Sequence, residues 1–188
     1  EGPRDVNDTR FVRFLYSRNV DVLSDLSHAQ WLTGSPDTAA GTAEAAVEYA
    51  REAQHELSLA NALAWACPVF YWSGDYVKAE QYIAMFEDQV RRHSIATWRP
   101  VALIYRGALA CALDGASNEG LAAIRRAVAE LRAIHHGARM PLYLGYLADA
   151  LARHGQHGEA ETTIHAALDR AEAQNEQCCA PELMRIHA

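Results

Sequence analysis

The sequence predicts an all-α protein, a right-handed solenoid of about four helical hairpins. Half of its 188 residues are apolar, alanine is abundant and β-branched residues are few, which favours closely packed helices over sheet. Glycines recur at spacings of 40 (74 − 34), 41 (115 − 74) and 40 (155 − 115), and a small residue follows each one five positions later. These glycines are Gly34, Gly74, Gly115 and Gly155. Four copies at a near-constant period indicate stacked helix pairs.

The expected elements follow from this period. Residues 1–19 are interpreted as a lead-in and a helical remnant that covers the first repeat. The paired helices are then expected at about 20–32 and 38–53, 57–72 and 76–92, 100–113 and 119–134, and 141–153 and 159–173. Pro36, Pro100, Pro141 and Pro181 suit helix starts, because a first-turn N–H has no intrahelical partner.

The period also predicts how the chain ends. The next glycine would fall near position 195 (155 + 40), beyond Ala188. Residues 181–188 would therefore begin a fifth repeat, and two turns of helix are too short to persist alone. We expect a repeat domain over 20–188, truncated in its fifth repeat and cut from a longer polypeptide.

Small residues are expected where the two helices of a hairpin cross, since large ones would overpack the contact. Seven positions before each glycine stand Ser27, Cys67, Ala108 and Ala148. Five positions after it stand Ala39, Ala79, Gly120 and Ala160. Larger apolar residues nine positions after it are expected to pack between neighbouring helices, at Ile83, Ile124 and Ile164, although the first repeat has the smaller Ala43.

Charge and composition limit the partners. The formal charge of −7 and the absence of clustered Lys and Arg argue against nucleic-acid contact by this segment. No apolar run approaches the roughly 20 residues of a membrane span, and no signal peptide is visible, so a cytoplasmic location is expected. The four cysteines lack paired metal spacings and fit a reducing compartment. For the neighbours Cys178 and Cys179, a redox or soft-metal role and an ordinary helix start both remain open.

No motif of catalysis, phosphate binding or metal binding is present, so we expect no catalytic residue, no metal and no cofactor. His154 and His157 straddle Gly155 and would point in unrelated directions. The adjacent His135 and His136 lie near an expected helix end, where helix capping explains them.

A ligand is expected on the first helices, which line the concave surface of such a stack. Aromatic side chains with a few polar groups suit a peptide or small organic ligand. The predicted ligand-binding residues are His28, Trp31, Asn61, Ala64, Tyr71, Trp72, Tyr105, Asp149 and Arg153. The alternative is that these aromatic residues only pack against the next repeat.

Pro68 breaks a local rule, because a proline inside a helix removes one hydrogen bond and bends the helix. The carbonyl that loses its donor belongs to Ala64, four residues earlier. We therefore hypothesise that the Ala64 carbonyl, Asn61 and Tyr71 form the polar part of the ligand site.

The step from Gly74 to Ala79, with small residues around it, resembles the tetratricopeptide repeat, although the usual period is 34 residues. The longer period is similar to the repeats of MalT-type regulators. Residues 64–69, 93–98, 153–160 and 180–186 resemble the C-terminal repeat region of large bacterial signalling proteins. In these, a winged-helix DNA-binding domain or a nucleotide cyclase domain precedes an ATP-binding module and the repeats.

The resemblance implies a non-catalytic sensor or protein-interaction domain of a bacterial transcriptional regulator. Its partner would be a peptide, a protein or a small-molecule effector in the groove, with no direct nucleic-acid or membrane contact. The uncovered end of the array makes a homodimer a further expectation. Two alternatives are the regulatory repeats of a nucleotide cyclase and a free-standing tetratricopeptide adaptor.

Overall fold

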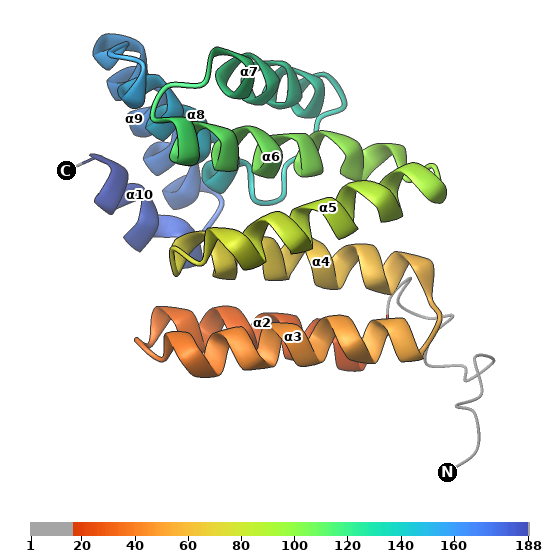
Figure 1. The fold of residues 1–188 in the computed structure, drawn as a ribbon. Helices are drawn as coiled ribbons and strands as arrows, with labels where there is room; N and C mark the ends of the chain where they lie inside the picture. Colours follow the sequence, from red (N-terminus) through yellow and green to blue (C-terminus); the bar gives the residue numbers. More distant parts are fainter. Residues whose placement is uncertain (1–16, 188) are drawn as a thin grey trace. The chain divides into compact units, whose positions relative to one another are not determined.

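The computed structural model describes residues 17–187, and within this range the chain forms helices and no strand (Figure 1). The elements are α2 (Arg18–Leu32), α3 (Pro36–Glu52), α4 (Glu56–Trp72), α5 (Tyr76–Arg92), the 3₁₀ turn η1 (Ala96–Trp98), α6 (Arg99–Asp114), α7 (Asn118–Ala133), α8 (Met140–Arg153), α9 (His157–Ala173), the 3₁₀ turn η2 (Gln177–Cys179) and α10 (Ala180–His187). The all-α prediction is confirmed, and the expected boundaries agree within two residues. The helical remnant expected before residue 17 lies outside the described residues.

The four periodic glycines lie at the turn inside each helical hairpin. Each adopts a left-handed backbone conformation, with φ between +70° and +81°. Gly74 illustrates the turn, since α4 ends at Trp72 and the Gly74 N–H donates to the Tyr71 carbonyl at 3.2 Å. A side chain in this conformation costs roughly 1–2 kcal/mol, which explains why glycine marks the position.

A second series of left-handed residues follows the second helix of each hairpin. Its members have φ between +52° and +55° and are spaced at 40 (94 − 54), 41 (135 − 94) and 40 (175 − 135). They are Gln54, Ser94, His135 and Asn175. The same period therefore governs both kinds of turn, although no glycine marks this one.

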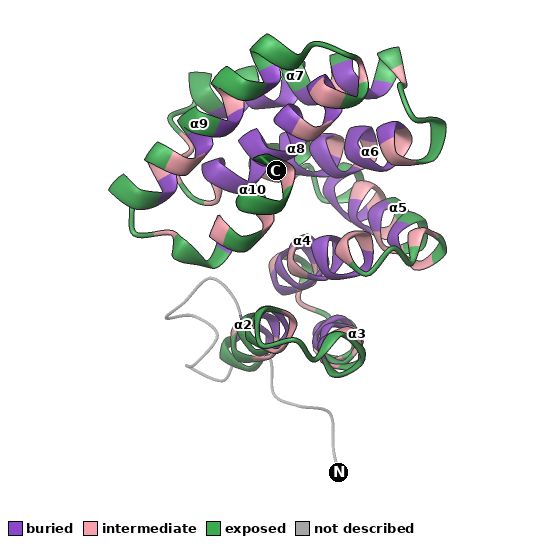
Figure 2. Ribbon diagram, turned by 90° about the vertical axis from the view of Figure 1, so that its left-hand side faces the viewer, coloured by how far each residue is buried: buried purple, intermediate pink, exposed green. Residues whose placement is uncertain are grey.

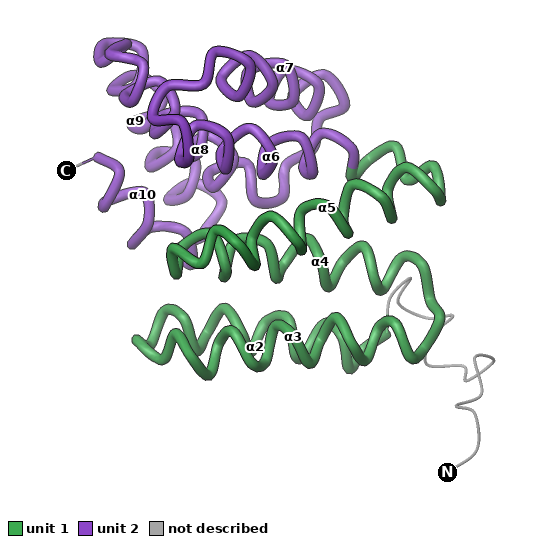
Figure 3. The backbone as a smooth tube through the Cα atoms, in the orientation of Figure 1, with its two compact units in different colours: residues 1–98 green, residues 99–188 purple. Residues whose placement is uncertain are grey.

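The chain folds into two compact units, unit 1 (Glu1–Trp98) and unit 2 (Arg99–Ala188) (Figure 3). In unit 1, α4 packs against α2, α3 and α5, and α2 packs against α3. In unit 2, α8 packs against α6, α7, α9 and α10, while α6 packs against α7 and α9 against α10. The expectation of a single repeat domain over 20–188 stays a prediction.

The core of each unit lies along its first helices. α4 and α8 are buried on most sides, as Figure 2 shows in purple. The second helices bury only one stripe, which in α5 comprises Ala79, Ile83, Phe86 and Val90 at helical spacing. The packing positions Ala43, Ile83, Ile124 and Ile164 are all buried, as predicted.

The small residues expected at helix crossings are also buried. A close crossing lies between α6 and α7, where Gly107 faces Gly120. A Cβ atom on Gly107 would lie 2.6 Å from the Gly120 carbonyl oxygen. Gly107 stands one residue before Ala108, the small residue that was expected at this crossing from its place seven positions before Gly115.

Candidate functional site

Four aromatic rings gather between α2 and α4 and form the aromatic cluster, which consists of His28, Trp31, Trp65 and Trp72. The ring centroid of His28 lies 4.5 Å from that of Trp65 and 5.3 Å from that of Trp72, both edge to face. The Trp31 and Trp72 centroids are 5.9 Å apart. The three indoles are partly exposed, whereas His28 is only 9% exposed. The cluster therefore presents indole surface over a buried imidazole.

A hydrogen bond holds the imidazole of His28 in place. Its Nε2–H donates to the Trp65 carbonyl oxygen at 2.9 Å. Because a carbonyl can only accept, this contact requires the proton on Nε2. The bond joins α2 to α4 and holds the His28 ring against the two indoles that it contacts.

Pro68 lies in α4, three residues after Trp65, and is buried. Ala64, whose carbonyl was expected to serve a ligand, is fully buried. The carbonyl of Trp65, one residue later, accepts a hydrogen bond from the His28 side chain. The hydrogen bond from α2 thus reaches α4 beside the place where proline interrupts the helical bonding pattern.

The polar residues predicted near Ala64 have protein partners. The Asn61 side-chain amide donates to Asp21 Oδ1 at 2.9 Å. Burial, together with the negative charge of Asp25, raises the pKa of the Asp21 carboxyl. Tyr71 contacts Tyr76, with ring centroids 5.9 Å apart. The hydrogen bond from Asn61 to Asp21 therefore connects α4 to α2, as the bond from His28 to Trp65 also does.

Trp72 carries a donor that stands out within the cluster. Its indole Nε1 is buried and has no hydrogen-bond partner among the described residues. An unsatisfied buried donor typically costs about 1–3 kcal/mol. A ligand acceptor that met this N–H after a small rotation of the indole would recover that cost.

The predicted site residues of unit 2 fall into two separate arrangements. Tyr105 is buried, and its ring centroid lies 6.5 Å from that of Tyr143 and 5.8 Å from that of Tyr146. Asp149 and Arg153 form an ion pair of 2.8 Å, one turn apart on α8. The structure therefore brings together the rings of His28, Trp31 and Trp72, whereas Tyr105 packs against other tyrosines and Asp149 pairs with Arg153.

Two neighbouring thiols in η2 differ in exposure. Cys178 is exposed, whereas Cys179 is buried and its Sγ lies 3.0 Å from the Glu176 carbonyl oxygen. The Cys179 thiol also hydrogen-bonds the Cys178 sulfur, which together with the positive charge of Arg139 lowers the pKa of Cys178 to about 6. The pKa of Cys179 is raised by the same bond and by burial. Cys178 is thus a candidate nucleophile that the bare sequence left open.

We expect the alkylation rate of Cys178 by iodoacetamide to rise with pH around a midpoint near 6, because only the thiolate reacts. The rate should fall as the pH drops through this value. Replacing Cys179 by alanine removes the thiol donor and should move the midpoint toward about 8.5. Mass spectrometry of the labelled peptides measures the profile, with the buried Cys67 and Cys111 as slow internal references. A midpoint near 8.5 in the unchanged chain would contradict the assignment.

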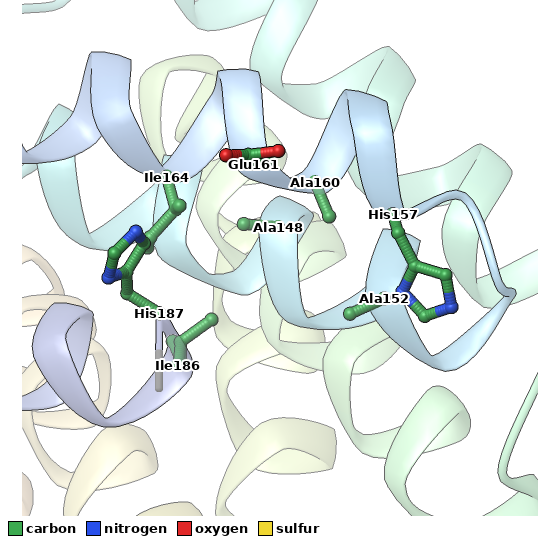
Figure 4. A pocket seen from close by; sticks show the side chains of 8 residues that line it. All are labelled: Ala148, Ala152, His157, Ala160, Glu161, Ile164, Ile186 and His187. Atoms are coloured by element: carbon green, nitrogen blue, oxygen red, sulfur yellow. The ribbon is translucent and has the colours of Figure 1, made fainter.

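A pocket of about 280 Å³ lies among α8, α9 and α10 (Figure 4). Its lining residues are Ala148, Ala152, His157, Ala160, Glu161, Ile164, Ile186 and His187. None of the nine predicted ligand-binding residues belongs to it.

Within residues 17–187, no three His, Cys, Asp or Glu side chains are grouped to hold a metal ion. In the same range, no helix is both long and apolar enough to cross a membrane.

Comparison of the sequence with protein-family models gave no match, and neither did comparison with curated proteins.

Proposed function

We propose that this chain is a non-catalytic sensor or protein-interaction domain of a cytoplasmic bacterial transcriptional regulator. It binds a peptide, a protein or a small-molecule effector on its first helices. The aromatic cluster is the observation that supports this most directly, because it combines partly exposed indoles with a fixed imidazole on two such helices. Partly exposed indole surface of this kind is typical of binding sites.

The proposal includes a tetratricopeptide-like solenoid. Its support is the period shared by the glycine turns and by the second series of left-handed residues, 40 or 41 residues in both. Equal spacing of both turns means that each hairpin repeats the one before it in length. Solenoids of this kind present the side chains of their first helices on one continuous surface.

The chemistry of the cluster indicates the kind of group that it binds. Trp31 and Trp72 offer a flat apolar surface, and Trp72 adds a hydrogen-bond donor that lacks a partner among the described residues. His28 already uses its Nε2–H within the protein. The site therefore suits an aromatic or aliphatic group that carries a hydrogen-bond acceptor, such as the backbone of a peptide.

Selection of phage-displayed random peptides on the 188-residue chain tests the binding function. We expect enriched peptides whose affinity falls at least about tenfold, equivalent to about 1.4 kcal/mol, in Trp31→Ala and in Trp72→Ala. The matched control is Val77→Ala, which removes an apolar side chain that is 72% exposed on α5 and should leave affinity unchanged. Enriched peptides that bind both tryptophan variants as tightly as the unchanged chain would refute the site.

The regulatory role has a separate test. We expect the gene to encode a winged-helix domain and an ATP-binding module on the N-terminal side of Glu1. A nucleotide cyclase domain there would instead identify the chain as the regulatory repeats of a cyclase. A start codon directly before Glu1 would instead identify a free-standing adaptor.

A further inference from the structure

Two imidazoles from different helices meet beside the pocket of unit 2. His165 lies on α9 and His187 on α10, and their Nε2 atoms are 3.1 Å apart. Their ring centroids are 4.9 Å apart, with 55° between the ring planes. Both side chains are exposed, and His187 also lines the pocket. The two nitrogens are therefore accessible to an ion from solvent.

This geometry is close to that of two imidazoles that share one metal ion. When both Nε2 atoms bind a tetrahedral Zn²⁺ at about 2.0–2.1 Å, they lie about 3.3 Å apart and the ring centroids lie about 5.2 Å apart. The observed distances of 3.1 Å and 4.9 Å differ from these by a few tenths of an ångström. In a straight N–H···N hydrogen bond of the observed length, the centroids would be about 5.4 Å apart. The rings are thus bent relative to one another, as chelation requires.

We propose that His165 and His187 bind Zn²⁺ through their Nε2 atoms and so fasten α10 to α9. Since no third protein ligand is grouped with them in residues 17–187, water completes the coordination. Imidazole is a good ligand for zinc and a poor one for the hard cations Mg²⁺ and Ca²⁺. Glu161 precedes His165 by one turn and lines the pocket with His187, so its negative charge favours a cation there.

The site would strengthen an attachment that the fold needs. α10 has eight residues, which is too few for a helix to persist without tertiary contacts. It packs against α8 and α9, chiefly through the fully buried Leu183. A metal bond between His187 and His165 would add a link near the last turn of α10, where that packing ends.

Isothermal titration of the tag-free chain with zinc chloride at about pH 7.5 tests the site. We expect one saturable binding event that His165→Ala and His187→Ala each weaken at least tenfold. His157→Ala is the matched control, because His157 also lies exposed on α9 but at the opposite end of the pocket (Figure 4). This control should bind zinc within twofold of the unchanged chain.

A second measurement separates zinc binding from a hydrogen bond between the two imidazoles. Zinc requires both Nε2 atoms without a proton, whereas the hydrogen bond requires a proton on one of them. NMR of the ring nitrogens should therefore show both Nε2 signals shifting together on zinc addition, with slower amide exchange in α10. Unchanged affinity in His165→Ala and His187→Ala would overturn the proposal, as would equal binding of Mg²⁺ or the absence of saturable binding.

Discussion

Replacing Gly107 by alanine is expected to destabilise unit 2 by about 1–2 kcal/mol. The added Cβ would lie 2.6 Å from the Gly120 carbonyl oxygen and 2.7 Å from Ile124 Cγ1. The carbonyl belongs to the backbone of α7, so the two helices must separate to relieve the clash. Overpacking of this kind costs about 1–3 kcal/mol, and it outweighs the gain of up to about 1 kcal/mol when alanine replaces glycine in a helix.

Urea denaturation followed by circular dichroism measures this effect. Gly120→Ala should behave like Gly107→Ala, because its Cβ would lie 2.7 Å from the Gly107 carbonyl oxygen. Gly41→Ala is the matched control, since Gly41 is an exposed glycine inside α3 and its Cβ would meet no atom within 4 Å. The control should be neutral or more stable by up to about 1 kcal/mol. Equal stabilities of the Gly107 and Gly41 variants would show that α6 and α7 do not cross this closely.

Replacing Leu183 by alanine is expected to release α10 from unit 2. Leu183 is fully buried and lies over Gly145 of α8, where its Cδ2 would be 2.7 Å from a Cβ on that glycine. Truncation of a buried leucine costs about 2–5 kcal/mol, which is large for the docking of an eight-residue helix. Native-state hydrogen exchange should then show α10 amides close to the rates of an unstructured peptide.

A second variant tests whether Leu183 packs directly on Gly145. Gly145→Ala alone should weaken the docking only slightly, because the end of the leucine side chain can shift. In the double variant the new Cβ occupies part of the space that Leu183→Ala vacates. The double variant should therefore weaken the docking of α10 by less than the sum of the two single effects. The exposed Met184→Ala, on the same helix, is the control and should leave α10 protected. Additive effects would contradict direct contact.

The helices could be predicted closely because their ends carry strong local signals. Gly74 supplies the left-handed residue of its turn, and Asp75 accepts a hydrogen bond from the Lys78 N–H at the start of α5. Pro36 and Pro141 stand at the first and second positions of their helices. Glycine, proline and capping residues act within one turn of their own position, so spacing alone locates them.

Other features depend on packing that spacing does not encode. The second series of turns is carried by residues such as Gln54 and Ser94, which adopt left-handed angles although they are not glycine. The meeting of His165 and His187 depends on how α10 lies against α9, across 22 residues of sequence. Neither the second series of turns nor the pair of histidines is marked by a sequence motif.

The candidate site shows the same limit. Helical periodicity places His28, Trp31 and Trp72 on neighbouring faces, and the structure brings their rings together. Periodicity gives the direction of a side chain but not how deeply it is buried, so it includes Ala64 although that residue is fully buried. It omits Trp65, because the period selects other positions of α4, although both the ring and the carbonyl of Trp65 contact His28.

The packing of each helix on its neighbours in the chain has a consequence for folding speed. In both units the helices pack mainly on elements that are consecutive or nearly so, such as α2 on α3 and α8 on α9. Low contact order of this kind is typical of domains that fold in microseconds to milliseconds, because little chain entropy is lost before the helices meet. Each hairpin can therefore assemble while the ribosome is still adding the next one.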